Sequence, residues 1–231
     1  MARIKYSALV SDMRNKLNGS VLSKNRAGSY VRNKTTPVNP QTQFQQLQRQ
    51  RLGALSTQWG SITQPQRQSW IASTSSFPYT DIFGDKKELD GKSLFIKLNS
   101  NLSNIGSPTI LQAPASVGVP VFGVDSALFT PGAFGLDDLT LNVSAPTVPA
   151  GFALAIYATS PIKPGVEFVK NKYRFLGVAT ATAGVVSATD LYNARFNSAF
   201  PAGYGLHIRV ALVSTTSGQQ GVPTGVKAEE V

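Results

Sequence analysis

The sequence contains no cysteine and only one histidine, His207, in 231 residues. Without thiols the chain cannot form disulfides, use a cysteine nucleophile, or hold iron–sulfur clusters and cysteine-ligated zinc. A single histidine also excludes metal sites that need two or more imidazoles. These absences remove most of the common catalytic and metal-binding arrangements, so we expect no metal and no cofactor.

Long apolar runs and charged residues are scarce as well. The longest apolar run, residues 151–158, is far shorter than the ~20 residues that a membrane-spanning helix needs. Residues 1–19 lack the apolar core and cleavage pattern of a secretory signal. Charged residues make up only 15%, whereas glycine (20) and proline (14) are plentiful. This composition favours turn-rich β-structure without membrane contact.

The positive charge is concentrated at the N-terminal end. Residues 1–51 carry ten basic side chains and one acidic side chain, a net +9 out of the +10 of the whole chain. Such segregation predicts an arm that meets nucleic acid or an acidic protein surface. The basic side chains are Arg3, Lys5, Arg14, Lys16, Lys24, Arg26, Arg32, Lys34, Arg49 and Arg51.

Residues 1–38 predict a basic extended arm or a small hairpin. Two short stretches, residues 19–22 and 28–32, have the character of strands and are joined by residues 23–27. Too few apolar residues are present for an independent core. We therefore expect the arm to become ordered on a neighbouring molecule.

Residues 39–106 predict a small helical domain. Asn39 before Pro40 is an N-cap signal, and Thr63 with Gln66 forms a capping-box pattern that opens a second helix. Asp90 is placed to cap a third helix, with leucines at helical spacing behind it. The aromatic residues expected in the core of this domain are Trp59, Trp70 and Phe95.

The remainder of the chain predicts β-structure. Residues 107–136 are interpreted as a proline-rich linker that includes a first strand, and about seven strand-like segments occur from residue 110 onward. Residues 204–212 alternate most clearly, with apolar side chains on one face and His207 and Arg209 on the other. The fold class predicted is α+β, with an all-β sandwich over residues 137–231.

The predicted sandwich resembles an Ig-like or fibronectin type III domain. Pro201 and Tyr204 before the alternating strand 204–212 resemble the tyrosine corner of that fold. The tryptophan expected on an early strand is missing, and Phe152 or Tyr157 is proposed in its place. The absence of a disulfide pair favours the fibronectin-like variant.

Residues 19–70 resemble a family of proteins encoded among the head and tail genes of tailed bacteriophages, including the crAss-like and other Bacteroidetes phages. Four elements carry this resemblance in fixed order: Gly28-x-Tyr30-Val31-Arg32, Thr36-Pro37-Val38-Asn39-Pro40-x-Thr42, Trp59, and Thr63-x-x-Gln66-Arg67-x-x-Trp70. The resemblance implies a virion-associated protein but does not indicate a biochemical mechanism. Ig-like modules are also frequent in phage decoration, collar and tail proteins.

No catalytic constellation is convincing. Gly91-Lys92-Ser93 matches only the end of a phosphate-binding loop, because Lys86 stands where that loop requires glycine. His207 is interpreted as a surface-facing strand residue, and the adjacent Asp137 and Asp138 as turn residues. We expect a protein that is not an enzyme.

The sequence thus predicts a structural component of a virion, in a collar or tail ring, a connector or a capsid-associated position. It would be made in the cytoplasm of the bacterial host and would act as a homo-oligomer. Its expected partners are copies of itself and other virion proteins, with the packaged DNA as a candidate for non-specific contact. Two alternatives remain open: adhesion to a host surface or glycan through the β-domain, and sequence-independent nucleic-acid binding through the arm.

Overall fold

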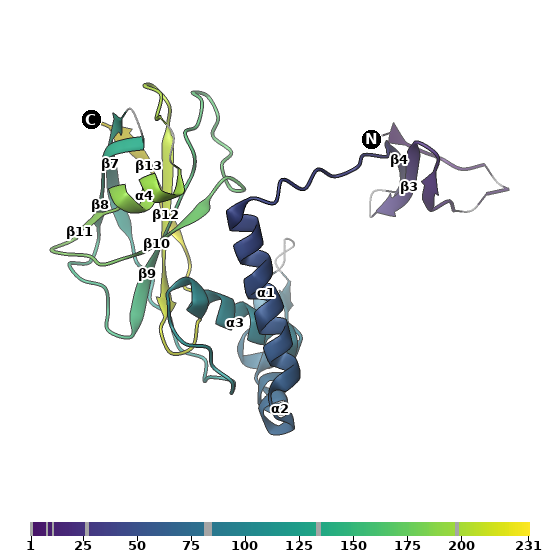
Figure 1. Cartoon of the computed structure of the whole chain (residues 1–231), viewed down its shortest axis with the longest axis horizontal. Coiled ribbons are helices and arrows are strands. Elements are labelled where there is room, and N and C mark those ends of the chain that lie inside the picture. Colours follow the sequence, from purple (N-terminus) through teal and green to yellow (C-terminus); the bar gives the residue numbers. More distant parts are fainter. Residues whose placement is uncertain are drawn as a thin grey trace. The chain divides into compact units, whose positions relative to one another are not determined.

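The computed structural model describes residues 2–7, 9–10, 12–25, 28–80, 85–132, 135–196 and 199–231 (Figure 1). The chain divides into two compact units, Met1–Leu47 and Gln48–Val231. A small β-sheet forms in the first, and the second contains helices and a larger sheet. The predicted α+β class is therefore confirmed. Within the described part of the chain, no helix is long and apolar enough to cross a membrane.

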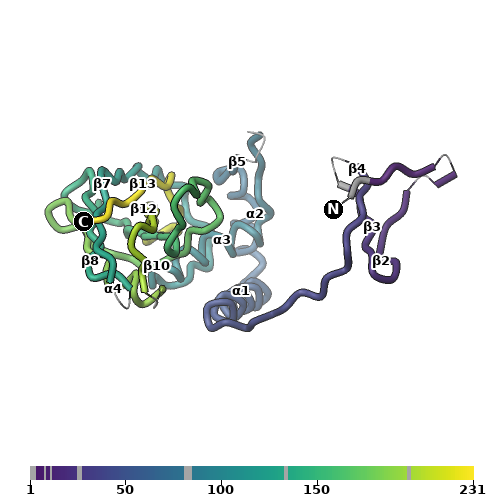
Figure 2. The backbone as a smooth tube through the Cα atoms, turned by 90° about the horizontal axis from the view of Figure 1, so that it is seen from above, coloured from purple at the N-terminus to yellow at the C-terminus, as the bar shows by residue number. Residues whose placement is uncertain are grey.

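The first unit contains a four-stranded antiparallel sheet. The predicted hairpin of residues 19–22 and 28–32 is confirmed as its two longest strands. A two-residue loop, Asn18-Gly19, precedes this hairpin, and Asn18 has a φ of 48°, which asparagine tolerates better than most residues. Residues 34–42 form neither helix nor strand and lead to the first helix (Figure 2). The strand order is β1-β4-β3-β2, with β1 (Ala2–Arg3), β2 (Asn15–Leu17), β3 (Ser20–Asn25) and β4 (Gly28–Asn33).

Helix α1 (Gln43–Ser61) begins later than the sequence predicts. Gln41 has a φ of 50°, a left-handed conformation that cannot be part of an α-helix. Thr42 occupies the capping position instead, and its Oγ1 accepts a hydrogen bond from the Gln45 N–H at 3.4 Å. The prediction that Asn39 caps this helix is therefore wrong.

The next two helices begin at the caps that the sequence predicts. The Thr63 N–H donates to Gln66 Oε1 at 2.8 Å, as in a capping box. The Asp90 carboxylate accepts a hydrogen bond from the Lys92 N–H at 3.2 Å. The helices are α2 (Gln64–Ala72) and α3 (Gly91–Asn104), and the segment between them contains the 3-10 turn η1 (Thr74–Ser76) and the short strands β5 (Tyr79–Thr80) and β6 (Lys86–Lys87).

An aromatic cluster joins these helices, as predicted. The Phe95 ring lies 5.5 Å from the Trp59 ring and 5.3 Å from the Trp70 ring, centroid to centroid. Close helix contact requires glycine at position 91, because a Cβ there would lie 2.8 Å from Cγ1 of Ile71. The buried members of the cluster are Leu55, Ile62, Trp70, Phe77, Leu94, Phe95 and Leu98.

Side chains of the helices hold the segment that follows α3. The buried Asn99 donates from Nδ2 to the carbonyl of Ile110 at 3.2 Å and accepts from the Ile110 N–H at 2.8 Å. Trp70 Nε1 donates to the carbonyl of Leu111 at 2.8 Å. The start of the segment predicted as a linker, residues 107–136, is thus hydrogen-bonded to the helices.

Seven strands form a mixed, nearly closed, barrel-like sheet with the order β10-β9-β12-β13-β7-β8-β11. The pairing of β13 with β7 is parallel, and the other neighbours are antiparallel. The first strand of this sheet lies in the segment 107–136, as the sequence predicts. The strands are β7 (Val124–Gly132), β8 (Gly135–Val143), β9 (Phe152–Ala158), β10 (Arg174–Ala179), β11 (Val185–Ser187), β12 (Leu206–Ser214) and β13 (Thr224–Glu230).

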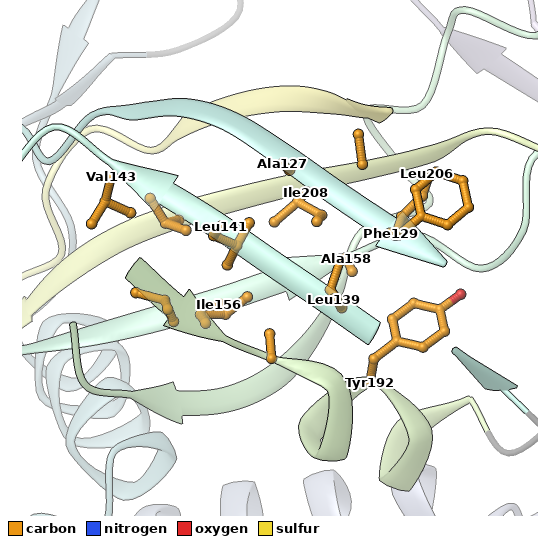
Figure 3. Packing of buried hydrophobic residues seen from close by; sticks show 14 of the residues in the cluster. Ala127, Phe129, Leu139, Leu141, Val143, Ile156, Ala158, Tyr192, Leu206 and Ile208 are labelled. Atoms are coloured by element: carbon orange, nitrogen blue, oxygen red, sulfur yellow. The ribbon is translucent and has the colours of Figure 1, made fainter. Parts of the chain in front are cut away.

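The core lies between the strand group β7-β8 and the group β9-β12 (Figure 3). The predicted inward face of β12 is confirmed, because its alternating apolar residues are almost completely buried. Tyr192 closes one end of the core, with its ring 5.0 Å from that of Phe196. The buried β12 side chains are Leu206, Ile208, Val210 and Leu212, and those of β8 are Leu139, Leu141 and Val143.

A short helix, α4 (Thr189–Arg195), contacts both β8 and β10. The Asn193 side chain donates from Nδ2 to the Leu136 carbonyl and accepts from the Leu136 N–H, both at 2.8 Å. The Asn193 side-chain amide thus forms the two hydrogen bonds that a neighbouring strand would form with the backbone of Leu136. The prediction of an all-β sandwich over residues 137–231 is wrong at this helix, because seven residues show too little of the helical period to be recognised.

Candidate functional site

The two faces of the N-terminal sheet differ in composition, and we call them the basic face and the apolar face after the majority of their charged and aliphatic side chains. Its register pairs Lys16 with Val21 and Val21 with Arg32, so these residues share a face. The next position along β3 lies on the opposite face, where Leu22 is paired with Val31. The basic face thus carries Lys16 and Arg32 together with Val21, and the apolar face carries Leu17, Leu22 and Val31 together with Lys24.

None of the described side chains of residues 4–47 is buried. Leu17, at the end of β2, remains 62% exposed. Ordinary small domains hide their apolar side chains in a core, and chains below about 40 residues usually need a disulfide, a metal or a partner to fold. The described residues of this unit therefore provide no layer that covers the apolar face of the sheet.

Most cations of this unit with described side chains have no acidic partner among the residues that the structure describes. Arg14 forms an ion pair with Asp12, with Nε 2.9 Å from the carboxylate. The others with described side chains form no ion pair among the residues that the structure describes, and they are Lys5, Lys16, Lys24, Arg32 and Lys34. Their charge is therefore available to an external anion.

The remaining predicted arm residues occupy different places. Arg3 lies in β1, and Arg26 lies outside the described residues. Arg49 and Arg51 belong to α1, and Arg51 donates a hydrogen bond to the Asn104 side chain. Arg51 thus contributes to the contact between α1 and α3, whereas the described basic side chains of the sheet are exposed. The assignment of the ten cations as an anion-contact arm stays a prediction.

A second group of polar and aromatic residues lies on the outer face of the larger sheet. The register places Phe175 of β10, Tyr157 of β9 and Arg209 of β12 in one row across three strands. The Arg209 guanidinium carbon lies 5.3 Å from the Tyr157 ring centroid and 4.7 Å from that of Tyr173. Two aromatic rings therefore hold this cation by cation–π attraction.

These tyrosines do not neutralise Arg209. Burial raises the pKa of Tyr157 and of Tyr173, although the charge of Arg209 acts in the opposite direction. Gln220 also donates from Nε2 to the Tyr157 hydroxyl at 3.1 Å. Both phenols thus stay uncharged at neutral pH. Arg209 Nε is buried and has no hydrogen-bond acceptor among the described residues.

A hollow of about 510 Å³ lies beside this row, between α3 and the loop from β12 to β13. Its polar lining comes from Ser76, Lys97, Ser116, Arg209, Gln219 and Gln220. Gln219 is held in place because Nε2 donates to Ser116 Oγ at 3.0 Å. Segments that are more than 100 residues apart in sequence therefore meet at one cationic recess.

A larger hollow, about 720 Å³, lies near the other end of β12 and includes His207 and Lys227 in its lining. His207 and Lys227 are paired across β12 and β13. Burial lowers the pKa of His207, and the positive charge of Lys227 lowers it further. Glu229 and Glu230 also line this hollow, so its wall carries charges of both signs.

The residues considered for catalysis occupy structural positions. Gly91 and Lys92 begin α3, as described above, and Asp138 accepts a hydrogen bond from the Thr140 hydroxyl at 2.9 Å. Asp137 and Asp138 lie within β8 rather than in a turn, so that interpretation is wrong. Among the described residues, no three histidine or acidic side chains lie close enough together to hold a metal ion.

Sequence reasoning missed the Arg209 row and the two faces of the N-terminal sheet. The alternation of β12 placed Arg209 outward, yet its aromatic partners lie on two other segments. The Asn18-Gly19 pair, however, was a usable signal, because asparagine–glycine between strands is the strongest short-range hairpin pattern. It would have set the register of β2 against β3 and hence the basic face.

In comparisons with known proteins, no family model and no curated protein matches the chain.

Proposed function

We propose that this chain is a non-enzymatic structural component of a tailed-phage virion, in a collar or tail ring, a connector or a capsid-associated position. Its N-terminal sheet and helical segment would form the anchor. One observation carries the proposal: the N-terminal unit is an ordered sheet without a single buried side chain among its described residues 4–47. Such a sheet needs a second surface to cover its apolar face.

A neighbouring copy of the chain can provide that surface. In a symmetric assembly each subunit offers the same patch to the next one, so one arm packs on the body of its neighbour and the contact repeats around the ring. The segment 34–42, which forms neither helix nor strand, supplies the reach for such an exchange. Burial of Leu17, Leu22 and Val31 would then contribute about 25 cal/mol for each square ångström of apolar surface removed from water.

We further propose that the seven-stranded sheet is an Ig-like or fibronectin-III-like sandwich. The strand order supports it when the sheet is divided between β13 and β7, because β9-β12-β13 then corresponds to the C-F-G strands and β8-β11 to the B-E pair of that fold. The parallel contact of β13 with β7 is short, limited to Glu229 with Leu128 and Glu230 with Phe129. This domain would project from the particle or contact its neighbours laterally.

The assembly is tested on the full chain by mass photometry. We expect the protein to form a discrete oligomer and Leu22→Asp to shift it to monomer. Ser23→Asp is the matched control, because it adds the same charge at the next position, on the opposite face of β3, and should leave the oligomer intact. A protein that stays monomeric at every concentration contradicts the proposal. The proposal is also contradicted if peptide mass spectrometry does not find the protein in purified virions of the phage that encodes it.

The basic face of the sheet favours a second candidate, sequence-independent binding of nucleic acid. Phosphate contacts release counterions, so the affinity of such a surface for duplex DNA falls steeply with salt, by about three orders of magnitude for about six contacts between 50 and 200 mM. A tight DNA complex at about 150 mM salt that Lys16→Glu and Arg32→Glu weaken would favour this candidate. Weak binding under the same conditions would favour protein contact.

A further inference from the structure

The recess between α3 and the β12–β13 loop has the size and the lining of a ligand site. Its volume of about 510 Å³ falls within the roughly 300–1,000 Å³ typical of small-molecule pockets. Phe77 and Leu94 form part of its apolar wall, and they are already rigid members of the helical core. The site is thus preformed on packed elements.

The charge of this recess is positive and uncompensated. Lys97 and Arg209 line it, and no carboxylate is among its lining residues. Neither cation forms an ion pair with any residue that the structure describes. Arg209 is held instead by the uncharged rings of Tyr157 and Tyr173, which orient the guanidinium without cancelling its charge.

The hydrogen-bonding groups point to the same kind of ligand. The guanidinium and the ammonium group only donate hydrogen bonds. The side-chain amides nearby already donate within the protein, Gln219 to Ser116 and Gln220 to Tyr157. The free capacity of the recess is therefore cationic and donor-rich, which suits an anion that accepts several hydrogen bonds.

We propose that this recess binds a carboxylate, at the scale of a glutamate side chain with its neighbouring peptide groups. A planar guanidinium and a carboxylate form two parallel charge-assisted hydrogen bonds. Phosphate sites usually include the N-terminus of a helix, and the lining of this recess contains none, because α3 contributes residues from its middle. This inference is independent of the assembly proposed above, which rests on residues 4–47.

The test is a titration of the ¹⁵N-labelled full-length protein followed by NMR. The probe is N-acetyl-glutamate N-methylamide, and its neutral control is the glutamine analogue. We expect saturable shifts of the Arg209 Nε–H signal and of the backbone amides of Lys97, Gln219 and Gln220. The glutamine analogue should bind at least about tenfold more weakly, because hydrogen bonds to charged groups contribute more than neutral ones.

Variants separate the site from a general effect of charge. Lys97→Gln should weaken binding of the glutamate probe about tenfold. Lys92→Gln, which removes an exposed lysine of the same helix outside the recess, should leave binding unchanged. Arg209→Lys keeps a cation but loses the paired donors, so it too should weaken binding. Its thermal melting curve shows whether the domain remains folded.

Three results would overturn the proposal. The first is a titration without saturable shifts at these residues. The second is equal binding of the glutamine analogue, which would show that the charge is not recognised. The third is inorganic phosphate binding as tightly as the glutamate probe at the same residues, which would make the recess a general anion site.

Discussion

Asn101 of α3 donates a hydrogen bond from Nδ2 to the carbonyl of Gly218 at 2.9 Å, across 117 positions of sequence. Gly218 has a φ of +71°, and its α-carbon lies so close to α3 that a Cβ would collide with the Leu98 carbonyl oxygen. The helical segment and the seven-stranded sheet therefore meet closely in the unit Gln48–Val231. The division into an arm, a helical domain, a linker and a sandwich at residues 38, 106 and 136 stays a prediction.

Gly218→Ala should lower the free energy of unfolding by about 3 kcal/mol, because the added methyl group meets the backbone of α3 and the positive φ is strained. Gly151→Ala is the matched control. Gly151 has a φ of +82° with nothing within 4 Å of its Cβ position, so that substitution should cost only about 1 kcal/mol. Urea unfolding of both full-length variants gives the comparison. Equal losses would show that the contact with α3 is unimportant for stability.

Adjacent residues of β12 should differ sharply in their effect on stability. Ile208 is fully buried, so Ile208→Ala should cost about 2–5 kcal/mol. Arg209→Ala removes a partly buried cation from two tyrosine rings and should cost about 1 kcal/mol. Chemical denaturation measures both. A larger loss for Arg209 than for Ile208 would contradict the assignment of inner and outer faces.

Tyr192 should contribute mainly through its ring. Its hydroxyl donates to the Thr159 carbonyl at a long 3.4 Å, so Tyr192→Phe should cost about 1 kcal/mol or less. Tyr192→Ala should cost about 3–5 kcal/mol, because it leaves a cavity at the end of the core. Burial raises the pKa of Tyr192, so its phenol should stay un-ionised in an alkaline spectrophotometric titration until the fold is lost. Early ionisation of this tyrosine in the folded protein would argue against its burial.

The fold should lose stability as the pH falls below about 6.5, the ordinary pKa of histidine. The pKa of His207 is lowered by burial and by Lys227, so the unfolded chain takes up this proton at a higher pH than the folded one. Stability from this residue is complete above about pH 6.5 and declines as the pH falls toward the lower, folded-state pKa. Denaturation curves of wild type and His207→Gln at several pH values test it. The free energy of unfolding of His207→Gln should change less with pH than that of the wild type. An equal change in both proteins would assign the pH dependence to carboxylates.

Trypsin should cut the N-terminal sheet far faster than the rest of the chain in the free protein. Its basic residues with described side chains are exposed and none of its described side chains is buried, so it opens easily. A resistant fragment that begins near Pro40 is expected by mass spectrometry, and the same cleavages should be suppressed in the assembled oligomer. If trypsin cut the N-terminal sheet of the free protein as slowly as the seven-stranded sheet, the N-terminal sheet would be shown to need no partner.

Local features of the sequence were enough to predict most helices and strands. The Thr63–Gln66 capping box and the Asp90 cap depend on residues within one helical turn, and they were predicted correctly. The alternation of Leu206, Ile208, Val210 and Leu212 reports which face of a strand is buried whatever strand lies next to it. Charge can be counted without a structure, so the basic N-terminal segment was also evident.

Tertiary structure decided which distant segments meet. The parallel contact of β13 with β7 and the contacts of α4 with both β8 and β10 depend on how strands curve around a shared core, and no local period records that. The recess is a stronger case, because Lys97, Arg209 and Gln219 come from a helix, a strand and a loop that are brought together only by packing. Sequence periodicity specifies the face of an element on which a side chain lies. The residues that this side chain contacts in remote segments depend on the complete fold, because such contacts form only when the surfaces of both segments are buried together.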